Sequence, residues 1–70
     1  MRNTSIKTII THPNWIITKV IQGRNGEVRI DAQKRFHEPD KSDFFSKWVS
    51  YRYANRIYKN LYGEDLQITY

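Results

Sequence analysis

The sequence predicts an α+β fold in which a three-stranded antiparallel sheet packs on one C-terminal helix, in the order β-β-β-α. Three observations support this fold class. Runs rich in β-branched residues fill the first half of the chain, a Gly-Arg-Asn-Gly turn signal joins two of them, and a long aromatic segment without acidic residues ends at a glycine. The chain has 70 residues, which indicates a single domain spanning 1–70.

Three segments are predicted to form the strands of the sheet. Residues 5–11, SIKTIIT, are rich in β-branched side chains and predict a short first strand. Residues 15–22, WIITKVIQ, give the strongest strand signal in the chain, and residues 27–33, EVRIDAQ, alternate as a partner strand should. The turn at residues 23–26 makes the second and third strands a hairpin, because Asn-Gly tolerates positive φ.

The hairpin register has two alternatives. A two-residue loop at the tip places Ile21 opposite Ile30, whereas a three-residue loop with Gly26 in a bulge places Lys19 opposite Asp31. The second register pairs unlike charges across the strands, a contact worth about 0.2–1 kcal/mol, and is therefore favoured.

A helix is predicted from about residue 41 to residue 62. Asp40 or Ser42 can cap its N-terminus, and Gly63 stands at the usual C′ position after its end. The last residues, 66–70, alternate again and form either a short fourth strand, which would extend the order to β-β-β-α-β, or a packed tail.

The predicted helix has an aromatic face that should pack on the sheet. A helical wheel places on one side Phe44, Trp48, Tyr51, Tyr58 and Tyr62. We expect Trp48 to be buried there, so that its replacement by alanine costs about 3–5 kcal/mol of stability. The remaining stripe of the wheel carries Arg52, Arg56 and Lys59, at i, i+4 and i+7.

The strand at 15–22 is apolar on both faces. Simple alternation places Trp15, Ile17 and Ile21 on one face, and Ile16 and Val20 on the other. Because one helix covers only one face of a sheet, something else should cover the second face. The alternatives are the C-terminal segment, a second copy of the chain in a homodimer, or a different protein.

Composition favours a soluble, basic, cytoplasmic protein. The net charge is +5 and the isoelectric point is about 9.8, which favours contact with polyanions. There is no cysteine, so disulfides cannot stabilise the small core. The chain has no signal-like segment at its start and no run near the roughly 20 apolar residues of a membrane span.

The sequence predicts no enzyme, no cofactor and no metal site. The two histidines, His12 and His37, stand beside turn residues in different parts of the chain, with no sign that they share one site. The two glycines near the hairpin tip serve a turn rather than a phosphate-binding loop.

Two functions remain open. The first is a small nucleic-acid-binding accessory or regulatory protein that contacts phosphates through hairpin and helix cations, namely Arg24, Arg29, Lys34, Arg35, Arg52, Arg56 and Lys59. The second is a protein-binding module or inhibitor that recognises an acidic protein surface, anchored by Trp15, Ile17 and Ile21 and steered by the cations. In either case the small size and the Asn-, Ile-, Lys- and Tyr-rich composition are typical of a phage or mobile-element product.

Overall fold

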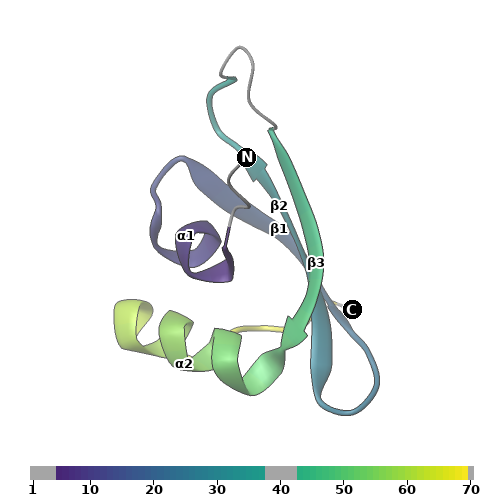
Figure 1. Ribbon diagram of the computed structural model, residues 1–70. Coiled ribbons are helices and arrows are strands. Elements are labelled where there is room, and N and C mark those ends of the chain that lie inside the picture. Colours follow the sequence, from purple (N-terminus) through teal and green to yellow (C-terminus); the bar gives the residue numbers. More distant parts are fainter. Residues whose placement is uncertain (1–4, 38–42, 70) are drawn as a thin grey trace.

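The computed structural model describes residues 5–37 and 43–69. Their elements are, in order, α1 (Ile6–Thr11), β1 (Trp15–Gln22), β2 (Glu27–Lys34), β3 (Phe44–Ser50) and α2 (Tyr51–Tyr62). The strands form one antiparallel sheet in the order β1-β2-β3, and both helices lie on the same side of it (Figure 1). The predicted fold class, a three-stranded antiparallel sheet followed by a C-terminal helix, is confirmed.

The first predicted strand is wrong, because residues 6–11 form the helix α1. Ser5 caps it, and its Oγ accepts a hydrogen bond from the Thr8 backbone N–H at 3.2 Å. Ile6, Ile9 and Ile10 fall on one helical face, at i, i+3 and i+4, and all three are buried. Burial of this isoleucine face outweighs the β preference of the branched side chains.

The favoured hairpin register is confirmed. Lys19 pairs with Asp31 and Val20 pairs with Ile30. At the tip, Gly26 has a φ of 76°, in the left-handed region that glycine adopts without strain.

A bulge at Thr18 divides β1 into two halves. The register of β1 against β2 shifts between Ile17 and Lys19, and the Thr18 hydroxyl donates to the backbone carbonyl of Asp31 at 3.2 Å. A bulged residue reverses the side-chain alternation that follows it.

The bulge changes which residues of β1 share a face. Trp15 and Ile17 pack with buried Val20 against the core, on the helix-covered side. Ile21 lies on the opposite, open side with Ile16. The prediction that Trp15, Ile17 and Ile21 form one surface is therefore wrong.

The N-terminal half of the predicted helix is the strand β3, and α2 begins only at Tyr51. Phe45 is buried against the core, whereas Phe44 and Trp48 point to the open side of the sheet. Trp48 is 53% exposed, so its predicted burial and its place on the helical wheel are both wrong. The predicted caps Asp40 and Ser42 lie outside the described residues.

The core lies between the sheet and the two helices. Isoleucines of α1 meet the inward residues of all three strands, together with Ala54 of α2 and Leu66 of the C-terminal segment. Thr69 then joins the edge of β1, because its N–H donates to the Val20 carbonyl at 2.8 Å and its Oγ1 accepts from the Val20 N–H at 3.1 Å. The described part of this segment is thus a packed tail rather than a strand, and Tyr70 lies outside the described residues.

Candidate nucleic-acid interface

The helix α2 positions three of the predicted site residues. Ser50 is its N-cap, with Oγ accepting from the Tyr53 N–H at 3.4 Å. Gly63 ends it with a φ of 76°, as predicted, and its N–H donates to the Lys59 carbonyl at 2.8 Å. Between these ends the predicted stripe is helical and exposed.

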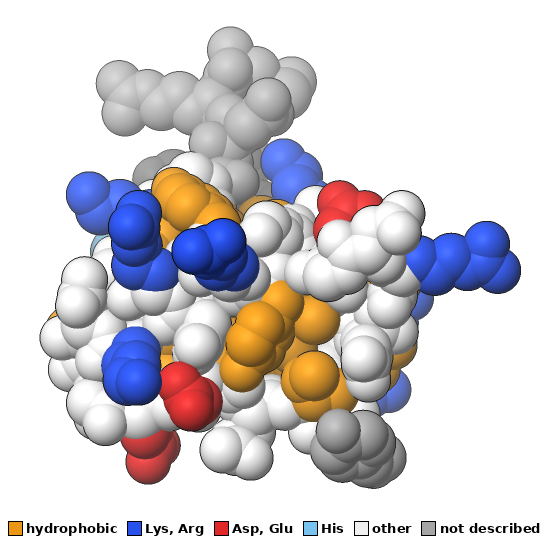
Figure 2. Space-filling model, turned by 90° about the horizontal axis from the view of Figure 1, so that it is seen from below, with side chains coloured by type: hydrophobic (Ala, Val, Ile, Leu, Met, Phe, Trp, Pro, Cys, Tyr) orange, Lys and Arg blue, Asp and Glu red, His pale blue; other side chains and the backbone are white. Residues whose placement is uncertain are grey.

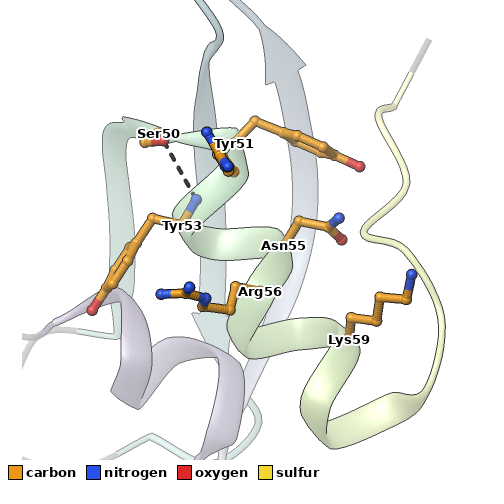
Figure 3. A pocket seen from close by; sticks show the side chains of 7 residues that line it. Ser50, Tyr51, Tyr53, Asn55, Arg56 and Lys59 are labelled. Carbon is orange, nitrogen blue, oxygen red and sulfur yellow. Dashed lines mark hydrogen bonds between the residues drawn. The ribbon is translucent and has the colours of Figure 1, made fainter.

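This α2 stripe, defined as Arg52, Arg56 and Lys59, runs along the outer side of the helix. Seen from the α2 side, Lys and Arg side chains stand out from the molecule beside patches of hydrophobic side chains (Figure 2). The stripe residues share an open depression in the surface (Figure 3) with Ser50, Tyr51, Tyr53 and Asn55. A separation of seven residues spreads the three cations over roughly 10 Å of helix axis.

The charge of the α2 stripe is only weakly compensated. Lys59 Nζ lies 3.7 Å from Asp65 Oδ1, and both side chains are more than half exposed, so this pair contributes little. Among the residues that the structure describes, no carboxylate forms an ion pair with Arg52 or Arg56. The sequence of α2 itself contains no acid. The outer side of α2 is therefore strongly positive.

The four predicted hairpin cations are spread around the sheet. Arg24 lies in the exposed hairpin turn, and Arg35 is exposed just beyond β2. Arg29 lies on the open face of the sheet, which the helices do not cover. The Lys34 ammonium lies 5.4 Å from the centre of the Trp15 ring, in a cation–π contact. These cations occupy separate places around the sheet.

Arg29 forms an ion pair with Asp31 on the same face of the strand β2. Its Nε lies 3.2 Å from Asp31 Oδ1, and its guanidinium donates to Asp31 Oδ2 at 3.3 Å. Asp31 is only 8% exposed and also accepts a 2.7 Å hydrogen bond from the Ser46 hydroxyl. Because this buried carboxylate needs its partners, Arg29 serves the sheet more than an external anion.

The open face of the sheet is a second exposed surface. Ile16 and Phe44 lie in one row across the strands, and Ile21 and Trp48 lie in another. A polar row of Lys19, Asp31 and Ser46 separates these two rows.

Sequence reasoning missed a groove between the two helices. It is lined by Lys7, Thr11, Tyr53, Ile57, Asn60 and Leu61. The signal that could have found it is the isoleucine spacing of residues 6–10, which makes Lys7 a helical neighbour of α2 rather than a strand residue.

Across residues 5–37 and 43–69, no three His, Asp or Glu side chains come together as metal ligands. Within the same part of the chain, neither helix has the length and apolar character needed to cross a bilayer. Comparisons with protein-family models, with curated proteins and with solved structures found no significant match to this chain.

Proposed function

We propose that this chain is a small, non-enzymatic, cytoplasmic nucleic-acid-binding protein that acts as an accessory or regulatory factor. The observation that carries the proposal is the α2 stripe, in which three exposed cations follow one side of an acid-free helix. Arg52 and Arg56 lack a carboxylate partner among the described residues, so their charge is available to an external anion.

The expected contact is with phosphates of the backbone. Cations spaced by roughly 6 Å and 4.5 Å along a helix can each meet a separate phosphate group of a polyanion. Such contacts supply affinity and orientation but carry no sequence information. The net charge of +5 adds a long-range attraction that speeds association.

The test is the salt dependence of binding to duplex DNA, measured by fluorescence anisotropy. Replacing Arg52, Arg56 and Lys59 by glutamine should flatten the slope of log K against log salt by roughly two to three units, because each lost phosphate contact removes about 0.9. The fold should survive, since exposed substitutions usually change stability by less than about 0.5 kcal/mol each.

The matched control replaces the exposed cations Arg24 and Arg35 by glutamine. We expect this variant to keep most of the wild-type slope. Absence of wild-type binding to DNA and RNA at low salt would refute the proposed function. If the stripe variant keeps the wild-type salt slope and the control shows a reduced one, the hairpin cations rather than the α2 stripe contact the phosphates.

A second candidate function is a protein-binding module, and the open face of the sheet favours it. Ile16, Phe44 and Trp48 are exposed there on the described surface, at 41%, 56% and 53%. Exposed aromatic residues on one face are typical anchors of a protein contact. In this alternative the anchors are these residues and Ile21, because Trp15 and Ile17 pack in the core.

A further inference from the structure

The groove between α1 and α2 is an apolar slot beside the α2 stripe. Ile57 and Leu61 of α2 supply aliphatic surface, and the Tyr53 ring forms part of its wall. Tyr53 is 50% exposed and Leu61 is 51% exposed, so the two helices leave this surface open. A flat apolar ligand can therefore enter the groove and lie against an aromatic ring.

Tyr53 belongs to both the groove and the depression at the α2 stripe. It lines the groove with Lys7 of α1 and lines the depression with Arg52 and Arg56. Tyr53 projects toward α1 and Arg56 projects from the same side of α2, whereas Lys59 projects toward the C-terminal segment (Figure 3). A ligand in contact with the Tyr53 ring thus lies beside cations on two elements.

The charge around the groove is positive on both helices. The sequences of α1 and α2 contain no acidic residue. Lys7 lines the groove, and Arg52 and Arg56 line the neighbouring depression, which shares Tyr53 with it. The amide of Asn60 adds a donor and an acceptor at the groove wall. The ligand that complements such a surface has a flat apolar body, a polar edge and an attached anion.

We propose that the groove receives an unpaired base of a single-stranded nucleic acid, which stacks on Tyr53 while Arg52, Arg56 and Lys7 contact the flanking phosphates. This inference rests on the proposed function and specifies its substrate class. Bases in a duplex are stacked on one another and cannot enter the groove, whereas unstacked bases of a single strand can lie on an aromatic side chain. The chain should therefore bind a single strand more tightly than a duplex.

The test compares fluorescently labelled single-stranded DNA of about 12 nucleotides with the duplex of the same sequence, by anisotropy at one low salt concentration. Tyr53→Ala should weaken binding to the single strand by roughly 5- to 150-fold and leave duplex binding unchanged. Tyr53→Phe, which keeps the ring, should retain the preference. Alanine is the best helix former, so α2 should persist, and a thermal melt checks this.

Two further variants complete the design. Tyr53→Leu keeps apolar packing against α1 without a flat ring, so it should lose the preference even if the alanine variant is unstable. Phe36→Ala removes an exposed ring that lines neither the groove nor the depression, so it should change nothing. If the leucine variant keeps full single-strand affinity, or Phe36→Ala causes the same loss, the base-stacking inference is wrong while nucleic-acid binding stands. If the wild type binds neither probe, the proposed function fails and the inference fails with it.

Discussion

At the scale of single residues, Tyr51 and Asn55 attach the C-terminal segment to α2. The Tyr51 hydroxyl donates to the Leu66 carbonyl at 2.7 Å, and Asn55 Oδ1 accepts from the Leu66 N–H at 2.7 Å. The Leu66 side chain is buried in the core. Both backbone groups of Leu66 are thereby satisfied as its side chain leaves water, which a packed segment without strand pairing requires.

Replacement of Tyr51 by phenylalanine isolates one of these hydrogen bonds. We expect the free energy of unfolding at neutral pH to fall by about 0.5–1.5 kcal/mol, the usual net worth of such a bond. Urea denaturation of wild type and variant measures the difference. An unchanged free energy of unfolding would show that water replaces the bond.

The same variant has a defined pH dependence. Burial, and secondarily the charge of Asp65, raises the pKa of Tyr51 above its ordinary 10.0. The folded state therefore holds the phenol proton more tightly than the unfolded state, and this contribution is complete below pH 10.0 and lost as the pH rises through the raised pKa. The difference in the free energy of unfolding between wild type and Tyr51→Phe should therefore decrease in that pH range. A difference that stays constant would contradict the raised pKa of Tyr51.

At the scale of elements, the hairpin could be predicted from the sequence because its signals are local. Asn25-Gly26 specifies the turn, and the unlike charges of Lys19 and Asp31 select the register. The bulge at Thr18 carries no comparable signal, because the residue reads as an ordinary β-branched strand position. Its effect on the face that Ile21 occupies depends on tertiary contacts that the sequence pattern does not encode.

Two other elements were mistaken because their patterns fit two periods. The isoleucines of α1 are β-branched, as in a strand, yet they also repeat at i, i+3 and i+4. In β3, Phe44 and Trp48 are four residues apart, which places them on one face of a strand as well as near each other on a helix. Contacts with the rest of the chain decide between such alternatives, and short segments lack the length to decide alone.

The candidate site was predictable only where the helix prediction was right. Arg52, Arg56 and Lys59 lie within α2, so their shared stripe is found as the wheel predicts. Lys7 could not be predicted to lie beside α2, because its segment was predicted to be a strand of the sheet. Tyr53 was not among the predicted site residues, although the structure leaves half of it exposed.

At the scale of the whole molecule, the helix side and the open sheet face differ in charge. The described helices carry cations and no acids, whereas the open face combines Lys19 and Arg29 with Glu27 and Asp31. A polyanion is attracted to the first surface, and the second has charges that nearly balance. The two candidate functions thus belong to opposite sides of one small domain.

The open face of the sheet predicts a homodimer in which two sheets pack face to face rather than pair at their edge strands. Thr69 already pairs with β1, and Lys47 stands in the middle of the edge strand β3, where two copies would bring like charges together. Light scattering at high concentration should give twice the monomer mass of 8.5 kDa, and Ile16→Lys should return the monomer. A wild-type mass of 8.5 kDa under the same conditions would rule out this dimer.

The most direct test of the central claim is a titration of isotopically labelled protein with a short single-stranded oligonucleotide, followed by amide chemical shifts in NMR. If α2 binds the nucleic-acid backbone, the largest changes in amide chemical shift should fall on Arg52, Tyr53 and Arg56, with smaller changes on Lys7. The chemical shift of the Trp48 indole N–H should not change, because this side chain lies on the open face of the sheet. Large shifts confined to Trp48 and its neighbours, with α2 unchanged, would contradict the account.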